Sequence, residues 1–394
     1  MALRGTPDWE ITWLAAKGDV SAGAIVADQW PPFVPWVLLR LANRLPVAER
    51  WRVRLGQIVA ERGLLRMVAR IGPDLVYLHN LHDACSFSFV ERLPRNVPLV
   101  WQLHDLWPLT GYCCYPVACE KYTEGCCGEC PQWDQWGTAP HAPAWEWARR
   151  DRFYRDNAGR ITFVGPSQWI VECAARRFPG CSAKRIPNAV DVAVFHPVRP
   201  QAAVRQALGL PADRPIVLAV SDWLDNPVKG ITTHLVGAME RVRRQALPAC
   251  MVVAVGHLHR PVALPDNWRV VGRVQDAALL NLYYNAADVF VCPSLAENFG
   301  QVLLESQAAG APTVVFDEGG CPEIVRDGAT GFVARNRDAA SLAEGIQRVL
   351  SMTAVERENL SRNCRGHAEA TYSLDVVIPQ YRALLMDLLE GARR

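Results

Sequence analysis

The sequence predicts an α/β fold made of two doubly wound, Rossmann-like domains, each built on a parallel sheet. Short apolar runs rich in β-branched residues alternate with helical stretches, a pattern typical of parallel sheets that are covered by helices. The series of runs occurs twice, and a proline-containing stretch at residues 185–205 separates the two series. The predicted strands are residues 11–15, 75–78, 99–103 and 161–164 in the first series, and 216–220, 250–255, 289–292 and 313–316 in the second.

Length and composition agree with two globular domains. The chain has 394 residues, of which 50% are hydrophobic and 21% charged, and a domain usually takes about 100 to 200 residues. This composition excludes a disordered or low-complexity protein. The net charge of +2 gives no argument for nucleic acid as a partner. The sequence contains neither GxGxxG nor GxxxxGK[ST], which weighs against dinucleotide-dependent dehydrogenases and P-loop NTPases.

The lengths of the apolar runs indicate whether the chain spans a membrane. They are far shorter than the roughly 18 to 20 residues of a membrane span, and no signal peptide opens the sequence. We therefore expect a cytoplasmic protein. Residues 40–70 carry eight arginines against two glutamates, with tryptophans nearby. Such a basic, aromatic stretch could rest on an anionic membrane surface and make the protein peripheral on the inner face, but ordinary amphipathic helices with solvated arginines explain it equally well.

The most informative segment is residues 293–312. A predicted strand leads into a loop, a helix begins near Gly300 or Gln301, and Gly310 followed by a proline ends it. Loop amides and a helix N-terminus attract anions such as a diphosphate. Glu297 in the loop and Glu305 in the helix could accept hydrogen bonds from the hydroxyls of a ligand. Considered without their context, two glutamates at this spacing are more often ordinary surface residues.

This segment, PSLAENFGQVLLESQAAGAPTVV, resembles the donor-site signature of retaining glycosyltransferase family 4, in which two glutamates stand eight residues apart. Residues 186–191, 228–230, 319–325 and 328–331 resemble other segments of that family. The resemblance implies the GT-B fold, with two Rossmann-like domains facing a cleft. Residues 1–187 would form the acceptor-side domain and residues 188–374 the nucleotide-sugar-binding domain. A C-terminal helix at 375–394 would pack back on the first.

The resemblance also implies roles for individual donor-site residues. Lys229 would bind the donor phosphates and offset charge on the leaving diphosphate, Glu297 would hold hydroxyls of the transferred sugar, and Glu305 would hold the ribose. The backbone amides that would support the phosphate and sugar are those of Asn298, Phe299 and Gly300.

The choice of lysine at position 229 is a second argument for a binding role, independent of the resemblance. Only four of the 42 basic residues are lysines, so a lysine beside Gly230 indicates a site that needs a compact charge. The alternative is a lysine that merely follows a strand and caps it.

Two features depart from the family pattern. Members often carry a second phosphate-binding arginine six residues before this lysine, where the present chain has Trp223. We nominate Arg273 as the substitute. The chain also starts at what resembles the end of the first helix, so the first βα unit of the N-terminal domain, roughly 25 residues, is expected to be missing.

Histidines follow two predicted strands of the first series. His104 lies in a WQLHDLWPLTG run that resembles the HDxWxxTG segment of the capsule, colanic acid and exopolysaccharide branch of the family. The resemblance implies that His104 is catalytic and approaches donor sugar and acceptor. His79 and His82 are further candidates, because both should also lie at the carboxyl end of the sheet.

Six of the 13 cysteines fall between residues 113 and 130. The resemblance extends into these cysteines, and tetrathiolate zinc is one physical interpretation in a reducing compartment. Disulfides, plain packing in a loop and a zinc-ribbon nucleic-acid module remain alternatives. The predicted zinc ligands are Cys113, Cys119, Cys127 and Cys130.

The resemblance as a whole implies a retaining hexosyltransferase. It would move a hexose from a nucleotide-diphosphate sugar to a lipid-linked saccharide acceptor in surface polysaccharide biosynthesis. Catalysis would need no obligatory cofactor, so zinc would serve structure only. A same-fold transferase with a soluble small-molecule acceptor and an inactive, truncated GT-B scaffold are the alternatives.

Overall fold

The structure is a computed structural model that describes residues 14–15, 25–26, 49–82, 85–117, 119–123, 125, 127–132, 142–244 and 250–393. The segment in which a first βα unit was predicted to be missing lies outside these residues. The chain divides into two compact units. The N-terminal unit contains residues up to 165, residues 171–184 and the end of the chain from residue 382, and the C-terminal unit contains residues 166–170 and 185–381.

The N-terminal unit is built on a four-stranded sheet. Its strand order is β3 (Val76–Leu78), β4 (Leu99–Gln102), β5 (Ile161–Gly165), β6 (Ser182–Arg185), and β3, β4 and β5 are parallel. The predictions of strands at 75–78, 99–103 and 161–164 are confirmed. A separate parallel pair joins β1 (Leu14–Ala15) and β2 (Ile25–Val26). The helices are α2 (Glu49–Ile71), α3 (Phe87–Glu91), α4 (Ala142–Asp156) and α5 (Gln168–Arg177).

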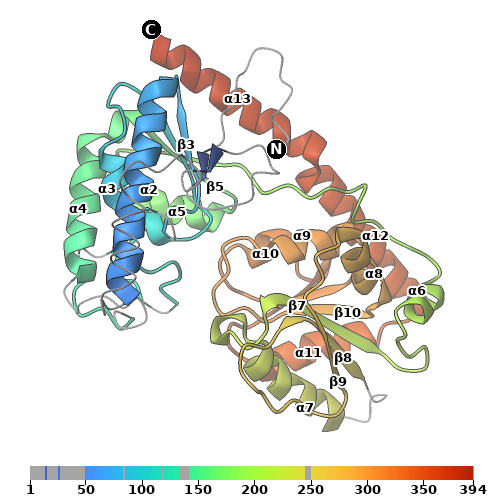
Figure 1. Cartoon of the computed structure of the whole chain (residues 1–394). Coiled ribbons are helices and arrows are strands. Elements are labelled where there is room, and N and C mark those ends of the chain that lie inside the picture. Colours follow the sequence, from blue (N-terminus) through green and yellow to red (C-terminus); the bar gives the residue numbers. More distant parts are fainter. Residues whose placement is uncertain are drawn as a thin grey trace. The chain divides into compact units, whose positions relative to one another are not determined.

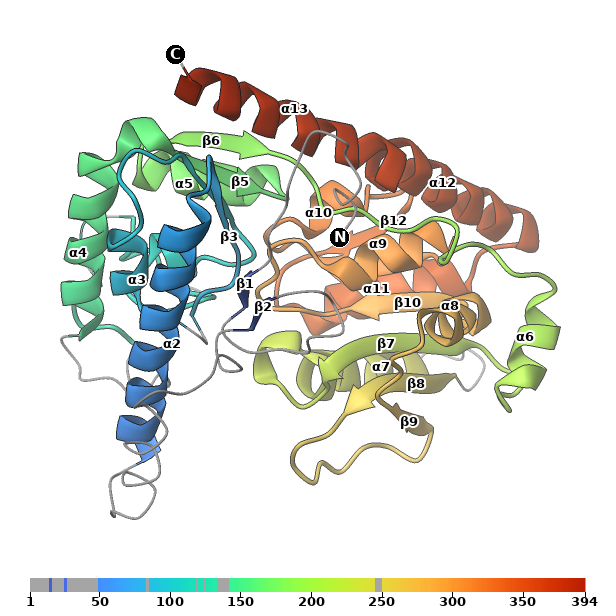
Figure 2. The same ribbon diagram turned by 45° about the horizontal axis from the view of Figure 1, so that its top comes forward.

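The C-terminal unit is built on a six-stranded parallel sheet. Its order is β12 (Gly331–Ala334), β11 (Thr313–Phe316), β10 (Val289–Cys292), β7 (Ile216–Trp223), β8 (Met251–His257), β9 (Trp268–Gly272). Figure 2 shows β10, β7, β8 and β9 in succession. All four strands predicted for this half are present.

Helices cover both faces of this sheet (Figure 1), as a doubly wound fold requires. One buried cluster joins the sheet to α6 (Gln201–Ala207), α8 (Ala277–Ala286), α9 (Gln301–Ala308), α10 (Cys321–Ile324) and α12 (Ala354–Tyr372). The cluster on the other face joins it to α7 (Val236–Arg244) and α11 (Ala339–Leu350). The last helix, α13, spans Leu374–Arg393. No described helix is sufficiently long and apolar to cross a membrane.

A buried charge network joins two helices of this unit to the two central strands of its sheet. The Asp288 carboxylate accepts hydrogen bonds from Arg205 (2.6 Å), Arg357 (2.9 Å) and the backbone N–H of Ile216 (2.7 Å). Asp288 is 5% exposed, so its charge needs these partners. The network joins α6 and α12 to the starts of β7 and β10.

Candidate active site

The predicted donor residues Lys229 and Glu297 meet directly. Lys229 closes a short 3-10 helix, η6 (Pro227–Lys229), that follows β7, and Glu297 lies in the loop after β10. The Lys229 Nζ atom is 2.8 Å from Glu297 Oε2. Glu297 is 8% exposed and Lys229 is half-buried. Burial lowers the pKa of Lys229, but the charge and hydrogen bond of Glu297 together outweigh it and raise the pKa above its usual value.

Backbone packing fixes the segment that carries Lys229 against the start of the Glu297 loop. The N–H of Leu295 donates to the carbonyl of Val228 at 2.7 Å. Gly230 has a φ of 65°, and a Cβ there would lie 2.1 Å from the carbonyl oxygen of Pro293. Only glycine therefore allows this approach. The Lys229–Glu297 ion pair therefore joins two segments, the one around Gly230 and the one around Pro293, whose backbones are already in contact.

A second glycine pair supports the Glu297 loop from another side. A Cβ on Gly319 would lie 1.9 Å from the Glu297 carbonyl oxygen, and a Cβ on Gly320 would lie 2.1 Å from that of Asn298. The Ser167 hydroxyl donates to Asn298 Oδ1 at 2.9 Å. Gly319 and Gly320, in the 319–325 segment quoted above for its family resemblance, thus pack closely against the loop that carries Glu297 and support it.

The helix after this loop agrees with its prediction. α9 begins at Gln301 with Gly300 as its N-cap, and Gly310, at a φ of 73°, follows its last turn. Asn298 and Phe299 are buried, and the Phe299 ring packs edge-on against Tyr372 at 5.8 Å between centroids. The predicted role of the amides of residues 298–300 in binding a phosphate stays a prediction.

Glu305 lies in the second turn of α9 and has a buried partner that the sequence did not indicate. The Tyr284 hydroxyl of α8 donates to Glu305 Oε2 at 2.9 Å. Burial raises the pKa of Glu305 to about 7, although the hydrogen bond from Tyr284 acts in the opposite direction. The carboxyl group therefore changes charge near neutral pH, which is unusual for a glutamate.

Arg273, the nominated second phosphate-binding residue, follows β9. Its Nε atom is 2.9 Å from Asp222 Oδ1, and both side chains are exposed. Asp222 precedes Trp223, whose exposed ring lies 4.9 Å from that of His259. Arg273 thus reaches the residue before Trp223, and its phosphate-binding role stays a prediction.

In the N-terminal unit, two of the three candidate histidines contact each other. His79 Nδ1 and His104 Nε2 are 2.9 Å apart, and the His79 ring stacks on Tyr77 at 4.7 Å. A hydrogen bond between two imidazoles needs one of them unprotonated. Burial lowers the pKa of His104, so a neutral His104 fits this pairing. The catalytic role of His104 stays a prediction.

The third candidate histidine, His82, belongs to a different group. Its Nδ1 atom lies 3.7 Å from Asp105 Oδ2. Asp105 directly follows His104 and is 7% exposed. The sequence predicted no role for Asp105.

The four predicted zinc ligands lie in one loop region. Cys113 and Cys127 are buried, Cys119 and Cys130 are half-buried, and all four are free thiols. Burial raises the pKa of Cys113 to about 12, and the other three cysteines contribute to the rise, so the four are neighbours. Among the described residues, however, the metal-ligand atoms that gather within 4.8 Å are those of His82, Asp105 and Cys114. Zinc binding by the four cysteines stays a prediction.

Comparison with known proteins finds a family similarity in the C-terminal half. Residues 200–367 match the model described as "Glycosyl transferases group 1". The chain is 33% identical over 227 residues to D-inositol 3-phosphate glycosyltransferase of Nocardia farcinica, covering 53% of this chain and 49% of that protein. It is 32% identical over 231 residues to the Geodermatophilus obscurus protein of the same name, with the same coverage. The chain thus spans about half the length of these curated relatives.

Solved structures extend the likeness to both units. Sucrose-phosphate synthase from Thermosynechococcus elongatus matches with a TM-score of 0.67 and 24% identity, covering 88% of this chain and 82% of that one. Anabaena HepE in complex with UDP-glucose matches with a TM-score of 0.60 and 19% identity, covering 84% of each chain. Residues 200–367 therefore resemble the glycosyl transferases group 1 family, and the two α/β units of the chain have the fold of GT-B glycosyltransferases.

Proposed function

We propose that this protein is a retaining glycosyltransferase that moves a hexose from a nucleotide-diphosphate sugar to a saccharide acceptor. The observation that supports this most strongly is the Lys229–Glu297 ion pair, with Nζ and Oε2 2.8 Å apart. It joins a cation that suits a diphosphate to a carboxylate that suits sugar hydroxyls. Anabaena HepE, a structural relative, has been solved with UDP-glucose, so UDP-sugars are the first donors to test.

The proposed mechanism depends on positioning and charge. The acceptor hydroxyl attacks the face from which the diphosphate leaves, and the leaving phosphate takes the proton of the acceptor. Lys229 offsets the charge that develops on the diphosphate, an effect on the order of 3 kcal/mol at a preorganised site. Glu297 orients the sugar, Glu305 holds the ribose, and His104 approaches the acceptor. Arg273 supplies the second positive charge toward the phosphates.

For the acceptor we propose a lipid-linked saccharide in surface polysaccharide biosynthesis. The support is the HDxWxxTG-like run around His104 and the arginine-rich stretch at residues 40–70. The side chains of Arg50, Arg52 and Arg54 lie outside those that the structure describes. A soluble acceptor is the second candidate, because two relatives are D-inositol 3-phosphate glycosyltransferases.

Liposomes distinguish the two acceptors. Each arginine near an anionic surface contributes about 1 kcal/mol, and salt screens the effect. The chain should sediment with anionic liposomes at low salt and be released at high salt, and replacing Arg50, Arg52 and Arg54 with serine should weaken sedimentation. Equal behaviour with anionic and neutral liposomes would favour the soluble acceptor.

The donor proposal is tested by incubating the protein with a panel of UDP-, GDP- and ADP-hexoses and measuring nucleoside diphosphate release. With a chromogenic glycoside as acceptor, the anomeric configuration of the product is read by proton NMR. Release with one donor and retention of configuration would support the proposal. A product of inverted configuration would contradict the retaining mechanism, and no release with any donor would favour an inactive scaffold.

A further inference from the structure

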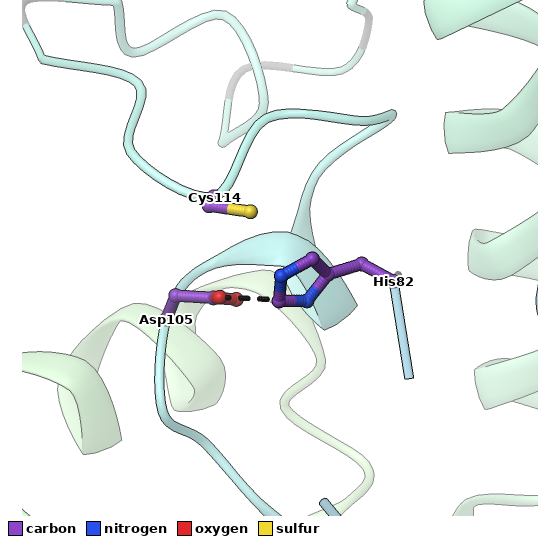
Figure 3. Close-up of side chains that lie close together, drawn as sticks. All are labelled: His82, Asp105 and Cys114. Atoms are coloured by element: carbon purple, nitrogen blue, oxygen red, sulfur yellow. Dashed lines mark ion pairs between the residues drawn. The ribbon is translucent and has the colours of Figure 1, made fainter. Parts of the chain in front are cut away.

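We propose that His82, Asp105 and Cys114 form a binding site for a divalent transition-metal ion, for which Zn²⁺ is the best match. These residues come from three places in the N-terminal unit: the loop after β3, the loop after β4, and the loop that follows η3 (Trp107–Leu109). Figure 3 shows the three side chains pointing toward one another. This site shares no residue with the predicted cysteine quartet and takes no part in the proposed donor site.

The distances suit one shared ion. The ligand atoms of the three side chains all lie within 4.8 Å of one another, and the His82 Nδ1 to Asp105 Oδ2 distance is 3.7 Å. Zinc bonds of about 2.0 to 2.3 Å in a tetrahedron place neighbouring ligand atoms roughly 3.3 to 3.8 Å apart. The imidazole and carboxylate are therefore already at that spacing, and the thiol sulfur lies within 4.8 Å of both.

The carboxylate is oriented by the backbone. Asp105 Oδ1 accepts the N–H of Trp107 at 2.8 Å, so Oδ2 is the oxygen that faces His82. Hydrogen bonds of this kind to metal-ligating side chains fix their orientation. Asp105 is 7% exposed, and a cation beside it would offset the cost of burying its charge.

The loop that carries Cys114 is fixed beside Asp105. The N–H of Leu106 donates to the Cys114 carbonyl at 2.9 Å. The Thr110 hydroxyl donates to the carbonyl of Cys113 at 2.8 Å. Fully buried Arg150 donates to the carbonyls of Thr110, at 2.9 Å, and of Trp107. The backbone around the site is held without the ion, which lowers the ordering cost of binding it.

The donor set selects the kind of metal. A thiolate with an imidazole favours zinc and similar first-row ions, whereas Mg²⁺ and Ca²⁺ prefer oxygen ligands alone. Three protein ligands leave a fourth position for water, and the side chain of His82 is 21% exposed, which gives an ion access. Binding deprotonates the Cys114 thiol and releases that proton to solvent.

Such an ion would tie the loop after β3 to the loop after β4. His79 lies in the first of these loops, and His104 directly precedes Asp105. The ion would therefore restrict the segments that hold the 2.9 Å His79–His104 pair. Its role would be to position these residues, and the proposal does not depend on the donor chemistry.

Cobalt titration of the metal-free full chain tests the proposal, because a thiolate bound to Co²⁺ gives a near-ultraviolet charge-transfer band. In Cys127→Ser, which lacks one ligand of the predicted cysteine quartet, we expect a saturable band at one equivalent with visible absorption typical of a tetrahedral ion, and displacement of cobalt by Zn²⁺. Adding Cys114→Ser should remove that band, and adding His82→Gln or Asp105→Asn should each weaken cobalt affinity at least tenfold. Cys113→Ser, one residue away, and Cys127→Ser are the matched controls and should keep this site.

The opposite patterns overturn the proposal. They are a titration without a band, or a band that persists unchanged in Cys114→Ser and His82→Gln but disappears in Cys127→Ser. Because His82 is partly exposed, His82→Gln should fold, and thermal unfolding without metal checks that it does. The cobalt readout is independent of glycosyl transfer, so an inactive enzyme that still binds cobalt would contradict the proposed function alone.

Discussion

Lys229 and Glu297 stand 68 residues apart in the sequence and form an ion pair with 2.8 Å between Nζ and Oε2. The reason is topological. Lys229 follows β7 and Glu297 follows β10, and these strands are parallel neighbours in the sheet. Carboxyl ends of parallel neighbours meet at one edge, where ligands of doubly wound folds bind. The pair is thus a direct consequence of strand order.

Donor binding should depend on pH through Glu305. Its carboxyl group has a pKa raised to about 7 by burial, and the protonated form accepts fewer hydrogen bonds from ribose hydroxyls. The affinity for UDP-glucose should fall roughly tenfold from pH 8 to pH 6. The diphosphate of a nucleotide sugar is esterified at both ends and does not titrate in this range. Calorimetry over this pH range measures the effect, and Glu305→Gln should bind weakly with no pH dependence.

The same pKa shift predicts a change in stability. The pKa is higher in the folded state than the usual glutamate value, so protonation favours folding. This contribution is fully present below about pH 4.3 and is lost as the pH rises through about 7. At pH 8, Glu305→Gln should therefore unfold at a higher temperature than the unchanged chain. The measurement compares the unfolding temperature of Glu305→Gln with that of the unchanged chain at pH 5 and at pH 8. If the variant gains less over the unchanged chain at pH 8 than at pH 5, the burial of Glu305 is contradicted.

Gly319→Ala should displace the loop that carries Glu297. Its Cβ would lie 1.9 Å from the Glu297 carbonyl oxygen, at a φ of 56° that already disfavours alanine. Gly328→Ala is the matched control, because its φ is 71° but a Cβ there meets nothing within 4 Å. Both variants should lose roughly 1 to 2 kcal/mol from the left-handed backbone. Only Gly319→Ala should lose more free energy of unfolding than this, as measured by urea denaturation, and it should also bind the donor at least tenfold more weakly. Equal effects of the two variants would contradict the proposal that Gly319 supports the loop.

Asp288→Asn should destabilise the C-terminal unit. The substitution leaves Arg205 and Arg357 facing a neutral amide, and removal of one partner from a buried ion pair costs about 3 to 5 kcal/mol. Asp213→Asn is the control, since Asp213 is 74% exposed and should change stability by less than about 0.5 kcal/mol. Urea denaturation compares the two. A loss as small as that of Asp213→Asn would mean that the network carries little stability.

Much of the fold could be predicted from sequence because its signals are local. Apolar β-branched runs identified seven strands of the two sheets but missed β6, β9 and β12, and Gly300 and Gly310 marked the ends of α9. The domain boundaries were less accessible. Residues 166–170 group with the C-terminal unit, because Glu323 accepts the backbone N–H groups of Gln168 and Trp169. No local sequence pattern predicts such a contact, because it joins residues about 155 positions apart.

The same limit applies to the candidate sites. Motif resemblance predicted Lys229, Glu297 and Glu305 as site residues, and this stays a prediction. The Tyr284 hydroxyl that donates to Glu305 comes from an apolar helix without a distinguishing signal. The gathering of His82, Asp105 and Cys114 depends on the conformations of the loops that carry them, whereas sequence spacing favoured a set of cysteines.

The most direct measurement is the affinity of the chain and of Lys229→Met for nucleotide sugars by calorimetry, with Lys184→Met as the control. Lys184 is exposed on β6, and its replacement removes the same charge. We expect the unchanged chain and Lys184→Met to bind one nucleotide sugar alike, and Lys229→Met to bind it at least tenfold more weakly while unfolding within a few degrees of the unchanged chain. Equal binding by all three proteins, or by none, would contradict a donor site built on Lys229 and Glu297.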